Sequence, residues 1–171
     1  MKILIVFGTR PEAIKMLPVV RALRGRTLLR PVVLVTGQHR QMLDQVFDAF
    51  NERPDIDLDL MMPGQSLSDI TVRVLQEMER ILAEQRPDLV LVHGDTTTAM
   101  AAALSAFYAR VPVGHVEAGL RSHNIGQPWP EEFNRISIDA VAEWLFAPTE
   151  VAADVLRRES PRPRRIQITG N

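Results

Sequence analysis

The chain has 171 residues, with 20 Lys and Arg against 21 Asp and Glu, no Cys, and 46% hydrophobic residues. A chain of this length buries roughly 70% of the surface that it would expose when unfolded, which predicts one domain with a single core. A net charge of −1 and an aromatic content of 5% argue against a nucleic-acid partner, which needs a basic surface and stacking side chains. Without cysteine there can be no disulfide, thiolate metal site or cysteine nucleophile.

The N-terminus and the apolar stretches bear on localisation. A strand-like segment, KILIVF, begins at Lys2, where a signal peptide would need a charged region and a longer apolar run. The longest apolar stretch, residues 99–108, is interrupted by Ser105 and is far shorter than the roughly 20 residues that cross a bilayer. We therefore expect a cytoplasmic protein without a membrane-spanning segment.

Short continuous apolar runs alternate with longer segments of helical period, which is typical of parallel strands joined by crossover helices. The predicted fold class is α/β, with a Rossmann-like, doubly wound and mainly parallel sheet. In chain order the predicted elements are Lys2–Phe7 (strand), Pro11–Arg24 (helix), Pro31–Thr36 (strand), Arg40–Phe50 (helix), Ile56–Leu60 (weak strand), Leu67–Gln85 (helix), Leu89–His93 (strand), Thr96–Ala109 (helix), Val111–Val116 (strand), Glu131–Glu143 (helix), Trp144–Ala147 (strand) and Glu150–Arg158 (helix).

Local signals support these boundaries and describe the tail. Residues 9–12, Thr-Arg-Pro-Glu, have the T-x-x-E form of a capping box with proline in the first turn. Residues 157–165 are basic and contain two prolines, so they are predicted to be a linker rather than a helix. Residues 166–171 are predicted to be a strand that leads into a turn.

Polar and ionisable residues follow several of the predicted strands. In open parallel sheets ligands bind beyond the carboxyl ends of the strands, where helix N-termini also point. Arg10, Asp95 and Glu117 come from three different strand ends, and Glu131 follows shortly. We therefore expect three carboxylates and a cation at one crevice. Acids gathered in this way raise at least one pKa, which fits general acid/base chemistry.

Each of these acids also has an ordinary structural explanation. Asp95 stands before three threonines and fits a helix N-cap. Glu131 and Glu132 lie in a predicted first helical turn, where acids offset the helix dipole. Glu131 and Arg135 also have the i,i+4 spacing of a surface ion pair. Taken one at a time, the structural explanations suffice, and only the convergence favours a functional site.

The histidines and the glycine loops give weaker signals. His93 and His115 end buried strands and are expected to be satisfied interior residues, while His39 and His123 are better placed for solvent or a ligand. No three of the four histidines share a metal spacing, so we expect no metal. The loop that begins at Gly8 is not G-x-G-x-x-G, and no phosphate P-loop is present.

Five motifs, in order, carry a family resemblance. They are Phe7-Gly8-Thr9-Arg10-Pro11-Glu12-Ala13-Ile14-Lys15, Thr36-Gly37-Gln38-His39, Val92-His93-Gly94-Asp95-Thr96, His115-Val116-Glu117-Ala118-Gly119-Leu120-Arg121 and Pro130-Glu131-Glu132-Phe133-Asn134-Arg135. Together they closely resemble the N-terminal half of the bacterial non-hydrolysing UDP-N-acetylglucosamine 2-epimerases. That family has two Rossmann-like domains in a glycosyltransferase-B arrangement. The resemblance implies an N-terminal domain over residues 1–165 and, at 166–171, the start of a hinge to a second domain absent from this chain.

The resemblance also implies an activity. It is the interconversion of UDP-GlcNAc and UDP-ManNAc with no cofactor or metal, in which UDP is eliminated across C1 and C2 to give 2-acetamidoglucal and then re-adds. Asp95, Glu117 and Glu131 are implied as catalytic acid/base residues, without a division of their roles. Arg10 and Lys15 are implied as cations on the substrate and phosphate side. The partners would be the two nucleotide sugars and UDP, with the complete enzyme a homodimer.

Further residues follow from the same resemblance. Arg135 is expected to orient Glu131 or to contact substrate, and Gln38, His39 and Gln41 resemble part of a regulatory UDP-GlcNAc contact. Because the family's second domain supplies a histidine and most nucleotide contacts, the chain alone is expected to bind weakly and to turn over little or nothing. A hydrolysing epimerase, a GT-B glycosyltransferase and a non-catalytic nucleotide-sugar-binding domain remain as alternatives.

Overall fold

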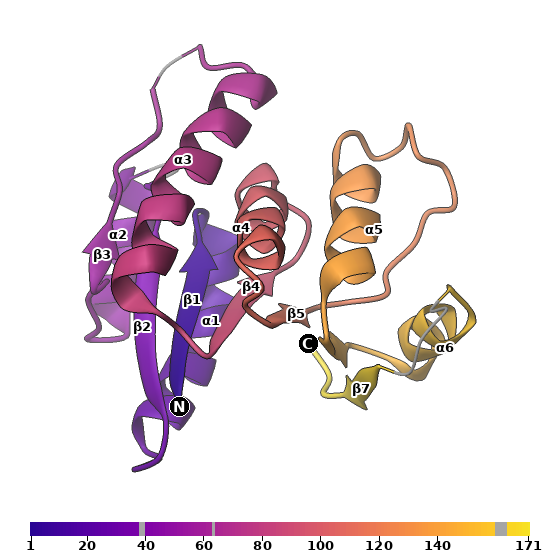
Figure 1. Ribbon diagram of the computed structural model, residues 1–171, viewed down its shortest axis with the longest axis horizontal. Helices are drawn as coiled ribbons and strands as arrows, with labels where there is room; N and C mark the ends of the chain where they lie inside the picture. Colours follow the sequence, from indigo (N-terminus) through magenta and orange to yellow (C-terminus); the bar gives the residue numbers. More distant parts are fainter. Residues whose placement is uncertain (38–39, 63, 160–163) are drawn as a thin grey trace.

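The structure is a computed structural model that describes residues 1–37, 40–62, 64–159 and 164–171. Over these residues a parallel sheet is covered by helices on both faces (Figure 1). The strands are β1 (Lys2–Phe7), β2 (Arg30–Val35), β3 (Ile56–Asp57), β4 (Leu89–His93), β5 (Val113–Val116), β6 (Trp144–Ala147) and β7 (Arg165–Ile168). The helices are α1 (Arg10–Arg24), α2 (Arg40–Ala49), α3 (Leu67–Gln85), α4 (Thr97–Tyr108), α5 (Glu131–Val141) and α6 (Glu150–Glu159). In the described part of the chain, no helix is long and apolar enough to cross a membrane.

The strands lie in the order β3-β2-β1-β4-β5-β6-β7, and every neighbouring pair is parallel. The chain first winds from β1 toward β3, then returns to the other side of β1 at β4 and continues outward to β7. The winding direction therefore reverses between β1 and β4, where Val6 is in register with Val92. Doubly wound sheets place their ligand crevice at such a switch point. The loops after β1 and β4 meet there.

Two apolar layers cover the sheet, and they are set by the alternation of side chains along the strands. In β1, Leu4 and Val6 point toward the cluster that includes α3 and α4, whereas Ile5 and Phe7 point toward α1 and α2. Phe7 stacks on Phe47 of α2 with ring centroids 6.0 Å apart. Figure 1 shows these two helix pairs on opposite faces of the sheet. Since both faces of the sheet are apolar, the polar side chains that follow the strands lie at the edge formed by the carboxyl ends of the strands.

The predicted α/β class and element order are confirmed, with small shifts at the ends of elements. The third strand is shorter than predicted, since only Ile56–Asp57 pairs with β2. The fifth strand begins at Val113 rather than Val111, because the Val111 backbone N–H closes the end of α4 by donating to the Ala106 carbonyl at 2.9 Å. Helix α5 ends at Val141, two residues before the predicted Glu143.

The C-terminal segment adds the last strand of the sheet. Arg165–Ile168 forms β7 and pairs in parallel with β6, which confirms the predicted strand. Part of the predicted linker, residues 160–163, lies outside the described residues. The strand residues of the segment 166–171 belong to the same sheet as the rest of the chain, and a hinge role for this segment stays a prediction.

Candidate active site

A buried carboxylate, Glu12, joins the loops that follow β1 and β4. Its Oε2 accepts hydrogen bonds from the backbone N–H groups of Gly8 (3.0 Å) and Thr9 (2.7 Å) and from the Thr9 hydroxyl (2.7 Å). Its Oε1 accepts from the Thr96 hydroxyl at 2.9 Å. The predicted capping box of α1 is thus confirmed. Burial raises the pKa of Glu12, and the hydrogen bonds from Gly8, Thr9 and Thr96 act against that rise.

Asp95, which lies two residues after the end of β4, does not cap helix α4. The N-cap is Thr96, whose hydroxyl accepts from the Ala99 backbone N–H at 3.1 Å. The Asp95 carboxylate instead accepts a hydrogen bond from the guanidinium of Arg135 in α5. The Asp95 backbone carbonyl accepts from the Asn134 side-chain amide at 2.9 Å. The capping interpretation of Asp95 was therefore wrong, because the hydroxyl of the next residue takes that position and leaves the carboxylate free to reach α5.

The electrostatics of Asp95 show that the three predicted acids lie near one another. Burial raises the pKa of Asp95, the guanidinium of Arg135 lowers it, and the negative charges of Glu117 and Glu131 raise it further. Asp95 and Glu131 also line one cavity of about 270 Å³. That cavity is lined by Thr9, Leu67, Ile70, Asp95, Thr96, Thr97, Thr98, Pro130, Glu131 and Asn134. The structure therefore brings Asp95, Glu117 and Glu131 together, while their catalytic roles stay predictions.

Glu117 stands on a strained turn directly after β5. Its backbone φ is +71°, in the left-handed region that a non-glycine residue rarely adopts. Lys15 of α1 donates to Glu117 Oε1 at 2.6 Å, and His93 Nε2 lies 3.7 Å from Glu117 Oε2. The Glu117 side chain is 17% exposed, so it reaches the edge of the cleft while most of its surface is covered. Lys15, expected from the resemblance to be a phosphate-side cation, thus lies against a candidate catalytic carboxylate.

His93 differs from the expectation of a satisfied interior residue. Its side chain is buried, yet neither ring nitrogen has a hydrogen-bond partner in the described part of the chain. Burial lowers the pKa of His93 to about 4, with Glu117 acting against that shift and Lys15 adding to it. The expectation was wrong for this histidine because the strand end carries its ring toward the carboxylate of Glu117 rather than toward a backbone acceptor.

A buried ionic network lies behind the Glu117 turn. His115 Nε2 contacts the Gly94 carbonyl at 2.8 Å, and Nδ1 contacts Asp139 Oδ1 at 2.6 Å. Asp139 Oδ2 lies 2.7 Å from Arg121 and accepts from the Gly119 N–H at 3.2 Å. Burial acts to raise the pKa of Asp139, but His115 and Arg121 hold it below its ordinary value. The prediction that His115 is a satisfied interior residue is confirmed, and the network ties the Asp95 turn to the Glu117 turn.

Arg135 does not form the ion pair with Glu131 that their spacing suggested. Besides Asp95, its guanidinium contacts Glu132, with Nη1 3.4 Å from Oε2. The structure therefore does not support the expectation that Arg135 orients Glu131 through an ion pair, while the alternative, a contact with substrate, stays a prediction. The reason is that the carboxylate of Asp95, which follows strand β4, lies within reach of the Arg135 guanidinium.

Glu132 is a further buried acid, and sequence reasoning did not single it out. Its carboxylate accepts from the backbone N–H groups of Ser122 (2.9 and 3.0 Å) and His123 (3.0 Å). Burial acts to raise the pKa of Glu132, but these hydrogen bonds and the charge of Arg135 hold it below its ordinary value. Glu132 fixes the loop that leads from Glu117 to α5. Only the paired acids at 131 and 132 hinted at it, and they fit a dipole role equally well.

The remaining predicted residues lie at the surface or outside the described part of the chain. Arg10 is exposed at the first residue of α1. Gln41 is exposed near the start of α2, whereas Gln38 and His39 fall outside the described residues. The substrate role of Arg10 and the regulatory role of the three residues at 38, 39 and 41 therefore stay predictions.

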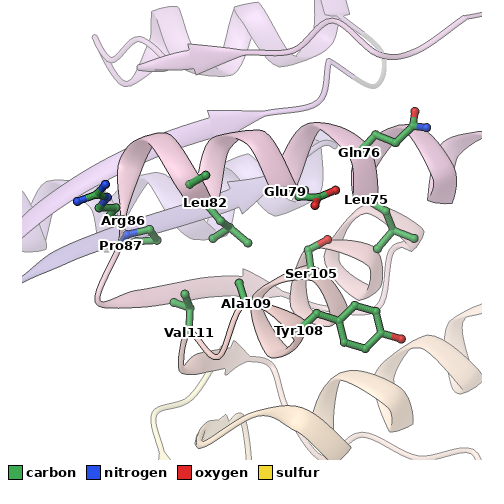
Figure 2. Close-up of a pocket in the computed structure, with 11 residues that line it drawn as sticks. Leu75, Gln76, Glu79, Leu82, Arg86, Pro87, Ser105, Tyr108, Ala109 and Val111 are labelled. Carbon is green, nitrogen blue, oxygen red and sulfur yellow. The ribbon is translucent and has the colours of Figure 1, made fainter.

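A larger cavity, of about 700 Å³, lies between α3 and α4, away from the acids (Figure 2). Leu75, Leu82, Tyr108 and Val111 give it mostly apolar walls, and Glu79 is its single carboxylate. It therefore lacks the paired groups that acid/base chemistry requires. Within the described ranges, no group of three or more His, Cys, Asp or Glu side chains is placed to hold a metal ion.

Comparison with known proteins places the chain in a family. The family model for UDP-N-acetylglucosamine 2-epimerase matches residues 21–171. The UDP-N-acetylglucosamine 2-epimerase of Escherichia coli K12 is 56% identical over all 171 residues, which span 46% of its length. The crystal structure of UDP-GlcNAc 2-epimerase from Neisseria meningitidis, bound to UDP-GlcNAc, is 50% identical with a TM-score of 0.95, covering 100% of this chain and 47% of that one.

A more distant structure shows the breadth of the fold. MurG from Acinetobacter baumannii, which has the glycosyltransferase-B fold, superimposes with a TM-score of 0.66 at 15% identity, covering 98% of this chain and 44% of that one. At this identity the likeness concerns the fold alone. The chain therefore corresponds to the N-terminal, Rossmann-like half of a two-domain arrangement and spans about half the length of the relatives it matches. By the family match and these identities, the chain belongs to the UDP-N-acetylglucosamine 2-epimerase family.

Proposed function

We propose that this chain forms the acid-bearing half of an enzyme that interconverts UDP-GlcNAc and UDP-ManNAc. A base takes the proton from C2 of the sugar, the C1–O bond breaks, and UDP leaves with the electron pair, which gives 2-acetamidoglucal. An acid then protonates C2 on the opposite face as a UDP oxygen re-forms the bond to C1. The observation that carries the proposal is the cluster of Asp95, Glu117 and Glu131 at the carboxyl edge of a chain in this family.

The surroundings of the acids suggest different tasks for them. Glu117 carries its charge beside the Lys15 ammonium, which suits a base that receives the C2 proton in one direction of the reaction. Asp95, whose pKa burial raises, suits a proton donor. Because the reaction is reversible, the two groups exchange tasks in the opposite direction. Glu131 lines the same cavity as Asp95 and is the third acid of the proposed site.

The departing diphosphate needs positive charge. Arg10 is exposed at the N-terminus of α1, where the helix dipole also favours an anion. Arg10 would therefore stand on the phosphate side of the cleft, whereas Lys15, the second cation that the family resemblance implies, lies against Glu117. No cofactor is required, since the leaving UDP returns as the nucleophile. We further propose that the complete protein is a cytoplasmic homodimer and that Gln38, His39 and Gln41 belong to a regulatory nucleotide-sugar contact.

The proposal is tested by incubating the protein with UDP-GlcNAc in D₂O and following the sugar signals by proton NMR. A version extended by a C-terminal half of the relatives' length is expected to produce UDP-ManNAc with deuterium at C2, because the C2 proton is lost to solvent during elimination. The 171-residue chain alone is expected to produce little or none. Conversion at the extended protein's rate by the chain alone would contradict the requirement for a second half.

The same spectra separate the alternatives. Free ManNAc together with UDP would identify a hydrolysing epimerase, and a product that forms only when an acceptor is added would identify a glycosyltransferase. UDP-GlcNAc that binds without any change in the extended protein would identify a non-catalytic binding domain. Epimerised sugar without deuterium at C2 would rule out the elimination route.

A further inference from the structure

His93 is a buried polar group that the proposed chemistry does not yet use. It ends β4, its side chain is 5% exposed, and both ring nitrogens lack a hydrogen-bond partner in the described part of the chain. Leaving a buried donor or acceptor unpaired is unfavourable, because the group has lost its hydrogen bonds to water without replacing them. Buried polar groups in folded proteins are almost always paired, so an unpaired imidazole beside a candidate active site requires an explanation.

The ring of His93 is aimed at one oxygen of Glu117. His93 Nε2 lies 3.7 Å from Glu117 Oε2, while the other oxygen, Oε1, is held by Lys15 at 2.6 Å. The distance to Oε2 is longer than that of a hydrogen bond, about 2.7–3.2 Å. A small shift of either side chain would bring the two atoms within that range. The charged and titratable groups that face the ring are Glu117, Lys15 and His115.

These surroundings keep the imidazole neutral. Burial lowers the pKa of His93 to about 4; the carboxylate of Glu117 opposes that shift, and Lys15 and His115 add to it. At neutral pH the ring therefore carries one proton on one nitrogen. A neutral donor can hold a carboxylate oxygen without adding a second full positive charge next to Lys15.

We infer that His93 is a positioning residue for Glu117, donating from Nε2–H to Oε2 when the nucleotide sugar fills the cleft, while Lys15 holds Oε1. This inference rests on the proposed function, in which Glu117 exchanges a proton with C2 of the sugar. A carboxylate held at both oxygens has one orientation, and a misplacement of about 1 Å can lower a rate by roughly 10²-fold. His93 itself touches neither the sugar nor the diphosphate in this scheme.

The first test uses the 171-residue chain labelled with ¹⁵N-histidine. Long-range ¹H–¹⁵N spectra at pH 7 are expected to show His93 as the neutral tautomer with its proton on Nε2. Glu117→Gln is expected to shift the Nε2 resonance, while Glu131→Gln, which alters an acid on the Asp95 cavity, leaves it in place. A charged ring, a proton on Nδ1, or a resonance that ignores Glu117→Gln would overturn the inference, whatever the activity of the protein.

The second test uses the extended protein and two substitutions of the same residue. His93→Leu removes the donor at similar volume and is expected to lower kcat about 10–100-fold with KM within about twofold. His93→Gln places an amide N–H near the position of Nε2 and is expected to recover most of kcat. Wild-type kcat in His93→Leu, or equal losses in both variants with native circular dichroism, would overturn the inference. A wild-type protein that does not epimerise would instead reject the proposed function, and the NMR test would still decide the role of His93.

Discussion

His115 and Asp139 form a buried ion pair, with Nδ1 of the imidazole 2.6 Å from Oδ1 of the carboxylate. The other nitrogen of His115 faces the Gly94 carbonyl, which can only accept a hydrogen bond, so Nε2 carries a proton. Asp139 also accepts from Arg121 and Gly119, as a carboxylate does. Nδ1 is then placed to donate to Asp139, so both ring nitrogens of His115 face an acceptor.

Asp139→Asn is therefore expected to destabilise the chain strongly. The amide keeps the shape of the side chain but leaves the charge of Arg121 and the Nδ1 of His115 without their shared carboxylate partner. Breaking a buried pair in this way is expected to lower the free energy of unfolding by about 3–5 kcal/mol. Urea unfolding at pH 7 measures this loss. Asp154→Asn is the matched control, because its pair with Arg157 is mostly exposed and is expected to contribute little to stability. Equal losses in the two variants would contradict the assignment.

The same pair predicts how stability depends on pH. The pKa of Asp139 is lower in the folded chain than its ordinary value of 3.8. A carboxyl of this kind binds a proton more readily when unfolded, so its contribution is complete above about pH 4 and is lost as the pH falls through the folded pKa. The difference in unfolding free energy between wild type and Asp139→Asn should therefore shrink below pH 4. A difference that is constant down to acid unfolding would contradict this.

The contribution of Glu12 to stability is expected to change with pH in the opposite direction to that of Asp139. Burial raises its pKa, so the folded chain binds the proton more readily, and the group's contribution to stability falls as the pH rises through the folded pKa. Glu12→Gln removes the buried charge and can still accept from Gly8 and Thr9, so its stability at pH 7 is expected to lie within about 1 kcal/mol of wild type. Glu12→Leu leaves these donors unpaired and is expected to lose about 1–3 kcal/mol.

Thermal and urea unfolding of the two Glu12 variants provide the measurement. The comparison is internally controlled, because both substitutions remove the same negative charge and differ in whether the oxygen acceptor remains. If Glu12→Gln destabilises the chain as much as Glu12→Leu does, the fold requires the negative charge rather than the hydrogen bonds that join the loops after β1 and β4.

The fold could be predicted from the sequence because its signals are local. The apolar run Lys2–Phe7 and the periodic segment Leu67–Gln85 have the same bounds in the structure as predicted. The grouping of Asp95 with Glu117 could be predicted for a related reason: strand ends of a parallel sheet share one edge, and both residues follow strand ends. Local rules sufficed wherever a residue's neighbours in sequence are also its partners.

The pairings inside the site could not be predicted, because the chain offers several partners at once. Arg135 has an acid four residues earlier, yet it pairs with Asp95, 40 residues away. Likewise, nothing local joins His115 to Asp139, which lies 24 residues on in a different element. Helical spacing indicates which pairs can form, whereas tertiary packing decides which of them does. His93 was misjudged for the same reason, since its burial was predictable but the direction of its ring was not.

Glu117→Gln tests the proposed base in the extended protein. The substitution keeps the size of the side chain and removes the charge that would accept the C2 proton, so kcat is expected to fall by about 10²–10⁴-fold. The dissociation constant for UDP-GlcNAc, measured by calorimetry, is expected to change by less than about threefold, on the scale of one weak contact. Glu84→Gln is the matched control, because Glu84 pairs with Arg80 on the exposed face of α3. Unchanged turnover would remove Glu117 from the catalytic set.

Arg135→Met tests the electrostatic coupling between α5 and the β4 turn. The guanidinium lowers the pKa of Asp95, while burial and the charges of Glu117 and Glu131 raise it. Removing the cation is therefore expected to move the Asp95 pKa further above its ordinary value, as followed by the ¹³C shift of its carboxyl group. Arg80→Met, which removes a cation from the exposed face of α3, should leave the titration of Asp95 unchanged. An unaltered Asp95 titration in Arg135→Met would contradict the pairing.

Gly119, in the turn between Glu117 and Arg121, is expected to tolerate no side chain. Its φ is +87°, and a Cβ there would lie 2.4 Å from the Ala152 carbonyl oxygen of α6, a contact that requires the backbone to move. Gly64 separates this clash from the effect of φ alone, since its φ is +77° and no described atom lies within 4 Å of the added Cβ. Gly64→Ala should therefore cost only the strain of a left-handed alanine, about 1 kcal/mol.

Gly119→Ala should exceed that cost by about 1–3 kcal/mol, the usual penalty for overpacking, in urea unfolding of the two variants side by side. Since Gly119 also donates to Asp139 at 3.2 Å, movement of this turn would disturb the ion pair with His115. The ¹⁵N resonances of His115 are thus expected to shift in Gly119→Ala and to stay in place in Gly64→Ala. Equal stability of the two variants would mean that α6 can move away from the turn at little energetic cost. The close packing of Gly119 on Ala152 would then not fix the position of the loop that follows Glu117.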